Sequence, residues 1–397
     1  MKGAESQTAA ILRELVAFDT TSHRSNLELI EFARSRLEAS GARCLRFPSD
    51  DRRKANLFAT IGPADRGGLM LSGHSDVVPA DPADWQSDPF TVAWRDGRFY
   101  GRGTADMKGF IAAVLAAAPG FADADLPVPV HIALTYDEEV GCLGAPALIR
   151  AVRKHAIQPR FCVVGEPTGM RVAIGHKGAR AYHAHFRGKA GHSSLAPFAV
   201  NAVEHAAALV DRLTRLGRRL AAEGPFDEGY DVPYTTVHTG VFHGGTQVNI
   251  VPARCDVDFE FRPLPEADAD AIEADIRGWV EDEIAPSMGR DHKECGVSLE
   301  RRYGYPGLDM DSADPMVDAF RALVQPSPAI RIAFGTEAGW FKNELAVPAI
   351  VCGPGHIGDA HRPDEFVSAD QLELCDRFLA GIRDELKAGR LIPQTAR

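Results

Sequence analysis

The stretch Leu69-Met-Leu-Ser-Gly-His74-Ser-Asp76 indicates the kind of fold, because a short apolar run passes directly into polar residues. Further apolar runs of this kind lie at 131–135, 161–164 and 349–351. Helical stretches separate them, such as 107–118 and 144–154. Short buried strands that alternate with helices predict an α/β domain whose mixed, largely parallel sheet is flanked by helices.

The sequence pattern changes near Lys177 and returns to the first pattern after Arg302. Alternating apolar and polar residues predict strands at 177–186, 235–242, 255–262 and 297–302, and helices are predicted at 201–216 and 268–284. This βαββαβ order is typical of a small sheet with two helices on one face. We therefore expect an inserted domain at 178–303, which interrupts a first domain formed by 1–177 and 304–397.

Composition excludes several classes of protein. A chain of 397 residues is too long for one compact core and fits two domains. The net charge of −11 disfavours nucleic acid and anionic membranes as partners, because an acidic surface repels both. The N-terminus lacks the apolar core of a signal peptide, and no stretch approaches the roughly 18 apolar residues of a membrane helix. Seven scattered cysteines without a CxxC pair predict reduced thiols in a cytoplasmic protein.

Polar residues follow the ends of the expected strands, or begin the helix near 107. In chain order they are His74, Asp76, Asp106, Glu138, Glu139, Glu166 and His361. Open α/β sheets form their ligand crevices at the carboxyl ends of the strands. We therefore expect five distant segments to deliver these side chains to one edge of the sheet.

Five of these side chains form a candidate metal-ligand set: His74, Asp106, Glu139, Glu166 and His361. The set suits two divalent cations better than one, since its three carboxylates and one bridging hydroxide balance the charge of two M²⁺ ions. A carboxylate between the cations, which we assign to Asp106, would hold them roughly 3.5 to 4 Å apart. Zinc is the expected metal, and Co²⁺ or Mn²⁺ could also fill a site of nitrogen and oxygen ligands.

Asp76 and Glu138 are the catalytic groups that we expect beside the metals. Asp76 lies two residues after His74, so on an extended chain both side chains project to the same face. The Asp76 carboxylate can then accept the second imidazole N–H and fix its tautomer. Glu138 is left over once Glu139 is a ligand, because adjacent residues generally point in different directions. We expect Glu138 to take a proton from the metal-bound water and deliver it to the leaving amine.

Longer motifs carry a resemblance over nearly the whole chain. They are SGHSDVVP (72–79), DPFTVAWRDGRFYGRGTADMKGF (88–110), TYDEEVG (135–141), GEPTG (165–169), GHKG (175–178), AGHSS (190–194), FRPLP (261–265), GTEA (335–338) and AHRPDEF (360–366). The chain resembles the metallopeptidase family that includes acetylornithine deacetylase, succinyl-diaminopimelate desuccinylase, aminoacylase and glutamate carboxypeptidase. GTADMKGF and GTEA are closest to the acetylornithine deacetylase branch. The resemblance implies a zinc-peptidase type of catalytic domain, an inserted lid that mediates dimerisation, and a cis peptide at Asp106-Met107.

The resemblance also adds site residues outside the metal-ligand set. His192 resembles the lid histidine that the partner subunit presents to the oxyanion of the tetrahedral intermediate. Asn249 and Arg262 resemble lid groups that hold the substrate carboxylate. Thr336 and Glu337 are further candidates for substrate binding. Glu337 could pair with a cationic amine of the substrate, or it could be a carboxylate at a helix N-terminus.

The activity that the resemblance implies is two-metal hydrolysis of the amide of an N-acyl amino acid. The leading reaction is N-acetyl-L-ornithine to L-ornithine and acetate, a step of arginine biosynthesis. The same chemistry on a dipeptide, an N-succinyl or N-carbamoyl compound, or N-acetylcitrulline stays an alternative, since the sequence specifies neither the size nor the charge of the pocket. A metal- or ligand-binding relative without catalysis would show a damaged ligand set or no base, whereas this chain has every expected ligand and the base Glu138. The expected partners are a small N-acyl amino acid and a second copy of the chain.

Three other patterns are set aside. Gly353–Gly358 matches GxGxxG, yet it lacks the following helix and the complete βαβ unit of a nucleotide site. Ser193 and Ser194 lie outside any GxSxG elbow, so a serine hydrolase is not expected. His183 and His185 alternate on an expected strand and are interpreted as exposed pair residues rather than ligands.

Overall fold

The chain forms two compact units. The computed structural model describes residues 6–324 and 327–392. The large unit consists of Met1–His176, Leu308–Ile332 and Thr336–Arg397, and the small unit consists of Lys177–Gly307 and Ala333–Gly335. The assignment of one unit to catalysis and the other to dimerisation stays a prediction.

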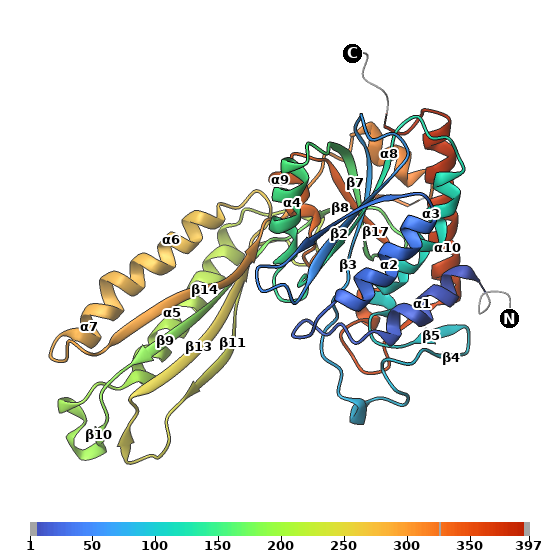
Figure 1. Cartoon of the computed structure of the whole chain (residues 1–397). Coiled ribbons are helices and arrows are strands. Elements are labelled where there is room, and N and C mark those ends of the chain that lie inside the picture. The colour runs from blue at the N-terminus through green and yellow to red at the C-terminus, as the bar shows by residue number, and fades with distance from the viewer. Residues whose placement is uncertain (1–5, 325–326, 393–397) are drawn as a thin grey trace. The chain divides into compact units, whose positions relative to one another are not determined.

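The large unit is organised by one mixed sheet with the strand order β1-β2-β6-β3-β7-β17-β8-β15, and β16 pairs with β8 (Figure 1). The strands are β1 (Arg43–Pro48), β2 (Ala55–Ile61), β3 (Gly68–His74), β6 (Val130–Thr135), β7 (Pro159–Pro167), β8 (Ala173–His176), β15 (Leu308–Asp309), β16 (Ile330–Ile332) and β17 (Ala349–Gly353). The central strands β6, β3, β7 and β17 are parallel, whereas β1, β2 and β15 pair antiparallel with their neighbours. The predicted α/β class with a mixed, largely parallel sheet is confirmed.

Helices cover both faces of this sheet (Figure 1). One layer packs around α3 and contains α1 (Gln7–Ala17), α2 (Leu27–Ala39), α3 (Gly109–Ala122) and α10 (Ala369–Lys387). The other contains α4 (Gly144–Lys154) and α9 (Ala338–Asn343), while α8 (Pro315–Arg321) stacks its Phe320 ring on Phe161 of β7. Every residue of β2, β3, β6 and β17 is buried, as the unbroken apolar runs of a sheet covered on both faces require.

One helical segment of the described chain passes a membrane span's criteria of length and mean hydropathy, although it includes the charged residues Asp106 and Lys108. The segment is Thr104–Ala122, which includes α3, and 72% of its apolar window is buried inside the protein. α3 contacts α1, α10 and the sheet. A helix surrounded by protein is apolar on every side, which accounts for this composition.

A small three-stranded sheet lies beside the start of α3. It has the order β18-β5-β4, formed by β4 (Ala93–Arg95), β5 (Arg98–Tyr100) and β18 (Phe366–Ser368). Pairing of β18 with β5 brings the chain just after His361 next to the GRGTADMKG segment, and the Gly101 amide donates to the Glu365 carbonyl at 2.9 Å. Short helical turns at Pro82–Asp84, Thr104–Lys108 and Ile357–Asp359 complete this region.

The small unit is a four-stranded antiparallel sheet with helices on one face. The sheet has the order β11-β13-β9-β14, formed by β9 (Ala179–Arg187), β11 (Thr236–Gly244), β13 (Arg254–Arg262) and β14 (Gly296–Tyr305). α5 (Ala202–Glu223) and α6 (Ala269–Trp279), which continues through Val280–Ile284 into α7 (Ala285–Gly289), enclose a core that includes Phe186, Leu209 and Phe259. A two-stranded ladder of β10 (Gly191–His192) and β12 (Ile250–Val251), with a turn at Ser193–Phe198, stands apart from this sheet. The predicted βαββαβ order is confirmed.

Candidate metal centre

The predicted ligands sit at the carboxyl ends of the four central parallel strands. His74 ends β3, Glu166 is the penultimate residue of β7, and Glu138 and Glu139 follow β6. His361 follows β17 after the turn at Ile357–Asp359. Parallel strands end at the same edge of a sheet, so residues remote in sequence meet there.

Four side chains gather around the Asp106 carboxylate. His74 Nε2 lies 3.0 Å from Asp106 Oδ1 and 3.6 Å from Glu166 Oε1. His361 Nε2 lies 3.2 Å from Asp106 Oδ2 and 3.0 Å from Glu139 Oε2. Asp106 therefore presents a different oxygen to each histidine, and all five predicted ligands are brought together.

Asp106 is held in place by a buried carboxylate to which the sequence interpretation gave no role. Glu365 Oε1 accepts hydrogen bonds from the amides of Ala105 at 2.9 Å and Asp106 at 3.1 Å. Its other oxygen pairs with Arg102 Nη1 at 2.6 Å. The Asp106-Met107 peptide is cis. The signal for Glu365 was its place in AHRPDEF, but only the pairing of β18 with β5 reveals the contact.

Asp76 differs from its predicted role. His74 Nδ1 is 2.9 Å from the backbone carbonyl of Asp76, whereas the Asp76 carboxylate lies 3.6 Å away. The carboxylate instead accepts from Ser22 Oγ at 2.8 Å and from the amides of Glu138 at 3.1 Å and Glu139 at 3.3 Å. The chain leaves the strand at His74, so the alternation assumed for an extended chain no longer applies. Asp76 orders the loop that carries Glu138 and Glu139.

The Glu138 carboxyl lies among other acidic groups. Cys142 Sγ donates to Glu138 Oε1 at 3.4 Å. The pKa of Glu138 is raised well above its usual value, first by removal of the carboxyl from water and then by the nearby charges of Glu139, Asp106 and Glu337. His74 opposes this rise. A carboxyl with a raised pKa is suited to carry a proton during a reaction.

The same crowding shifts the pKa values of the other ionisable groups in the cluster. Burial and the neighbouring Asp106 raise the pKa of Glu139 to about 7, and burial raises that of Glu166 well above its usual value. Hydrogen bonds to Asp106 and Glu139 raise the pKa of His361 to about 10. Crowded buried carboxylates of this kind are stabilised by bound cations.

Two combinations of these side chains have the spacing of a metal site. His74, Asp106 and Glu139 form one, and His74, Glu138 and Glu166 form the other, with ligand atoms within 4.8 Å of one another in each. Imidazole nitrogen and carboxylate oxygen suit zinc and similar divalent cations. These residues could therefore hold metal ions, and the donor set fits such ions.

Thr336 and Glu337 are both buried in the large unit. Glu337 Oε2 accepts from Thr135 Oγ1 at 2.8 Å, while Glu337 Oε1 has no hydrogen-bond partner among the described residues. Burial raises the pKa of Glu337 to about 7. Thr336 Oγ1 accepts from the Ala338 amide at 3.0 Å, so it caps the first turn of α9. Glu337 lies at the N-cap of α9 but does not cap it with its side chain.

The predicted substrate residues of the small unit fall into two places. His192 lies on β10, its Nδ1 is 2.8 Å from Ser194 Oγ, and the Ser193 amide donates to the Asn249 carbonyl at 3.1 Å. Arg262 ends β13 and its Nε donates to Glu260 Oε1 at 2.8 Å. The structure thus brings His192 and Asn249 together but leaves Arg262 at a different end of the sheet.

Comparisons with known proteins agree with this architecture. Residues 70–384 match the model of peptidase family M20/M25/M40. Acetylornithine deacetylase of Myxococcus xanthus is 37% identical over 94% of this chain and 95% of its own length, and that of Pasteurella multocida (strain Pm70) is 34% identical over 94% of each.

Solved structures share the fold at lower identity. The M20 family metallo-carboxypeptidase Sso-CP2 from Sulfolobus solfataricus superposes with a TM-score of 0.79 at 18% identity, covering 96% of this chain and 100% of that one. The Bacillus subtilis YXEP protein, a dinuclear metal binding peptidase, gives a TM-score of 0.66 at 15% identity, covering 96% and 98%. The chain therefore belongs to peptidase family M20/M25/M40, and it is a metal-dependent amidohydrolase.

Proposed function

We propose that the protein hydrolyses N-acetyl-L-ornithine to L-ornithine and acetate at a centre for two zinc ions. The observation that carries the two-metal part is the position of Asp106, which offers one carboxylate oxygen to each of two histidines. Acetylornithine deacetylases that are 33–37% identical to this chain support the substrate.

The contacts divide the ligands between two positions. His74, Asp106 and Glu166 would hold one cation, because His74 contacts both carboxylates. Asp106, Glu139 and His361 would hold the other, because His361 contacts both carboxylates. Three carboxylates neutralise three of the four positive charges. When bound, the two cations polarise the acyl carbonyl and lower the pKa of water at the centre.

Glu138 is the proposed proton carrier. Its carboxyl has the spacing of a ligand with His74 and Glu166, and we give the ligand positions to the five other side chains. Its loop is fixed by hydrogen bonds from the Glu138 and Glu139 amides to Asp76. Glu138 would take a proton from the attacking water and then deliver it to the amide nitrogen, which leaves as an amine.

Glu337 is the proposed partner of the substrate's side-chain amine. Its Oε1 has no hydrogen-bond partner among residues 6–324 and 327–392, and such a buried oxygen is costly until a donor reaches it. A cationic amine would satisfy this oxygen and keep Glu337 ionised. N-Acetylcitrulline carries a neutral group at the corresponding place, so this contact favours acetylornithine over it.

A second copy of the chain is needed to combine the proposed small-unit residues. Arg262 ends β13, whereas His192 and Asn249 lie near the beginning of that strand, where the chain arrives from β12. Eight residue steps along a strand span about 26 Å, which is longer than an N-acyl amino acid. One small unit therefore cannot supply all three residues to one substrate.

Exposed apolar side chains support a homodimer through the small unit. Val248 is 100% exposed, Phe198 is 74% exposed and Leu195 is 55% exposed, and they lie around the ladder of β10 and β12. Exposed apolar groups that gather in one place commonly mark protein interfaces. We propose that His192 and Asn249 reach the substrate from the partner, where His192 would stabilise the oxyanion while Arg262 and Asn249 hold the carboxylate.

The cysteines support a reducing compartment. All seven are free thiols, and only Cys44 is not buried. Cytoplasmic localisation, as expected from the sequence, is the proposal that fits this usage.

The substrate is tested by comparing kcat/KM for N-acetylornithine, N-acetylcitrulline, N-succinyl-diaminopimelate and a dipeptide, with the zinc-loaded protein under identical conditions. We expect a clear preference for N-acetylornithine. A preference for another compound would overturn the substrate and keep the chemistry. Inactivity on all four would contradict the proposed function.

The partner's contribution is tested by mixing two inactive variants, Glu138→Gln and His192→Ala. A mixed dimer contains one site with an intact Glu138 and an intact His192 from the other subunit, so activity should reappear after subunit exchange. Each variant alone, taken through the same exchange procedure, provides the control and should stay inactive. Dimers that exchange subunits yet stay inactive would contradict the assignment of His192 to the partner's site.

A further inference from the structure

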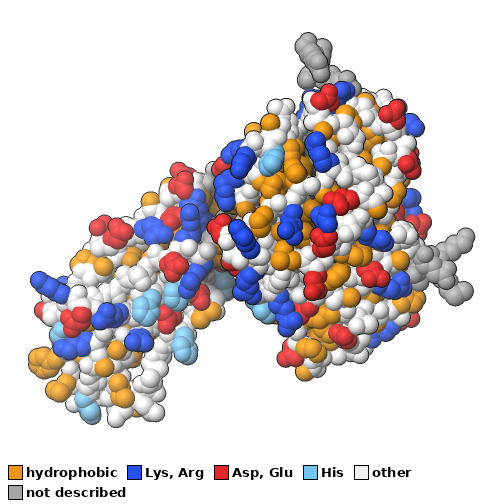
Figure 2. Space-filling view, in the orientation of Figure 1, with side chains coloured by type: hydrophobic (Ala, Val, Ile, Leu, Met, Phe, Trp, Pro, Cys, Tyr) orange, Lys and Arg blue, Asp and Glu red, His pale blue; other side chains and the backbone are white. Residues whose placement is uncertain are grey.

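The small-unit sheet has one polar face that the helices leave open. Along β9 and β13, apolar side chains are buried on the helix side and polar ones alternate with them on the other. The register pairs His185 with Asp256 and His183 with Asp258 across these two strands. In Figure 2 histidine side chains are visible on this part of the surface, next to acidic ones.

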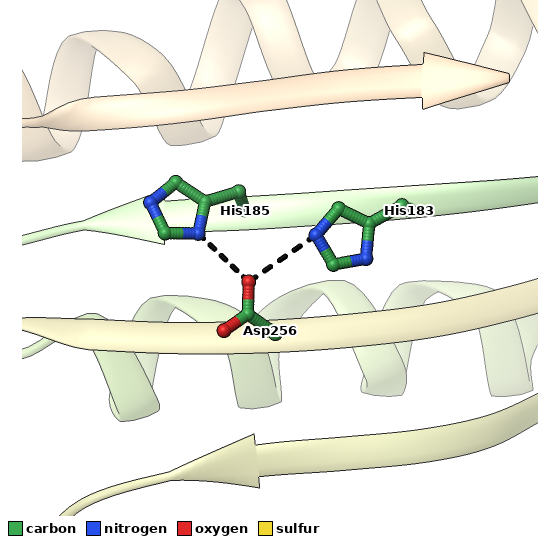
Figure 3. Close-up of side chains that lie close together, drawn as sticks. All are labelled: His183, His185 and Asp256. Carbon is green, nitrogen blue, oxygen red and sulfur yellow. Dashed lines mark hydrogen bonds and ion pairs between the residues drawn. The ribbon is translucent and has the colours of Figure 1, made fainter. Parts of the chain in front are cut away.

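Three of these side chains converge on one point (Figure 3). His185 Nδ1 lies 2.7 Å from Asp256 Oδ1, and His183 Nε2 lies 3.2 Å from the same oxygen. The three ligand atoms all lie within 4.8 Å of one another. Ligand atoms of a tetrahedral zinc site stand about 3.4 Å apart, given bonds of about 2.0 to 2.2 Å. A cation would therefore fit among them after small side-chain shifts.

The second nitrogen of His183 strengthens this interpretation. His183 Nδ1 lies 2.6 Å from Asp258 Oδ1, the distance of a hydrogen bond that donates to the carboxylate. A metal-bound histidine commonly donates its other N–H to a carboxylate, which fixes the tautomer and aims the free nitrogen at the metal. Asp258 is in the position to do this for His183 Nε2.

A second proton on His183 or a bound cation would each satisfy these contacts. A neutral imidazole carries a proton on one nitrogen only. With the His183 proton donated to Asp258, its Nε2 lone pair faces the Asp256 carboxylate oxygen at 3.2 Å. Two lone pairs at that distance repel each other unless a second proton or a cation lies between them. A divalent cation satisfies His183, His185 and Asp256 together.

We propose that His183, His185 and Asp256 form a binding site for one divalent transition-metal ion, such as Zn²⁺, separate from the centre in the large unit. Their side chains are 22%, 39% and 38% exposed, so a cation can enter from solvent and water can complete its coordination. The register also places His243 opposite Asp256 across β11 and β13. The proposal does not depend on the proposed substrate or mechanism.

The test is the zinc content of the full-length protein after equilibrium dialysis against a fixed free zinc concentration, at a pH about one unit above the usual imidazole pKa near 6.5. We expect His183→Gln and His185→Gln each to bind about one zinc ion per chain fewer than the unchanged protein, because each removes one ligand. His238→Gln is the matched control, since His238 lies on the same face and pairs in register with Glu260 instead.

Asp256→Asn provides a second variant that keeps the size of the side chain, and it should also lose this ion. All variants should keep the zinc that supports hydrolysis, as judged by unchanged kcat. Equal zinc content in the unchanged protein, His183→Gln and His185→Gln would overturn the proposal. An equal loss in His238→Gln would also overturn it, because the binding would then not depend on this cluster.

Discussion

The two units carry histidine and carboxylate clusters that are built in opposite ways. The cluster of the large unit comes from five separate segments, and its His74, Asp106 and Glu166 side chains are 1%, 6% and 4% exposed. The cluster of the small unit comes from two neighbouring strands, and its side chains are 22% to 49% exposed. Similar residue types therefore meet in two different environments.

Burial decides what each cluster requires. A carboxylate removed from water costs several kcal/mol unless it is paired, so the crowded acidic groups around Asp106 need compensating charge. Water can solvate Asp256 and Asp258, so their cluster tolerates the absence of a cation. The large-unit centre should therefore affect both reaction and stability strongly, and the small-unit site should affect mainly its own affinity for metal.

The largest expected effect belongs to Glu138. Glu138→Gln should lower kcat for the amide substrate by about 10²- to 10⁴-fold, because the amide cannot carry the proton. Zinc content should stay unchanged, since the proposed ligands remain. Steady-state kinetics and metal analysis of the same preparation provide the two measurements.

Asp137→Asn is the matched control for this variant, because Asp137 is the neighbouring acidic residue and pairs with Lys54. It should keep most of the activity. If Glu138→Gln retained near-normal kcat, the assignment of the proton carrier would be wrong, and a loss of zinc would point to a ligand role for Glu138 instead.

Metal removal should have the next largest effect, on stability. A ligand present at about a thousand times its dissociation constant stabilises the folded state by about 4 kcal/mol. Denaturant unfolding with a chelator should therefore give a lower free energy than unfolding with zinc by roughly this amount. His185→Gln should retain most of the difference, because that variant leaves the buried cluster intact. A difference that vanished in His185→Gln would show that the exposed cluster provides the stabilisation.

The sequence predicted what depends on local pattern. The apolar run before His74 and the acidic residues after Thr135 identified both the strands and the ligands, since strand ends in a parallel sheet meet at one edge. The sequence did not predict the roles of Glu365 and Ser22, because their contacts with Asp106 and Asp76 depend on pairing between segments far apart in the chain.

Features that depend on the tertiary structure were a second reason why the structure differs from the sequence-based predictions. The Asp76 side chain was placed by assuming an extended chain beyond His74, and the turn there redirected it to the loop of Glu138. The segment Thr104–Ala122 has the length and mean hydropathy of a membrane span, and only the tertiary structure shows that protein covers most of it. Neither outcome can be obtained from residue spacing alone.

His131 extends the comparison of buried and exposed histidines to acid stability. It lies on β6 with Nδ1 3.0 Å from Thr60 Oγ1, and burial lowers its pKa from 6.5 to about 4. Between these two pKa values His131 is protonated in the unfolded chain but neutral in the folded chain. The free energy of unfolding therefore falls as pH drops from about 6.5 toward 4. Between pH 7 and 5 this loss amounts to about 2 kcal/mol.

His131→Gln should remove that part of the acid sensitivity, because the amide stays neutral and can still bond Thr60. Chelator-treated protein should be used, so that metal binding does not contribute to the pH dependence. His155→Gln, at an exposed position on the same unit, is the matched control. Equal pH slopes of the unfolding free energy in His131→Gln and the unchanged protein would contradict the role of His131.

The smallest effect on stability is expected for Asp258, which tests the exposed cluster without touching its three proposed ligands. Exposed ion pairs contribute about 0 to 1 kcal/mol, so Asp258→Asn should change the unfolding free energy by less than about 1 kcal/mol. The same change should weaken zinc binding at His183, His185 and Asp256 by about 10- to 100-fold, because carboxylates behind metal-bound histidines have effects of that size.

Zinc titration of the Asp258→Asn variant, with His238→Gln as the control, measures the affinity, and chemical denaturation measures the stability. A stability loss without a change in zinc affinity would mean that Asp258 serves only the sheet, whereas the opposite result would show that it orients His183 toward a cation.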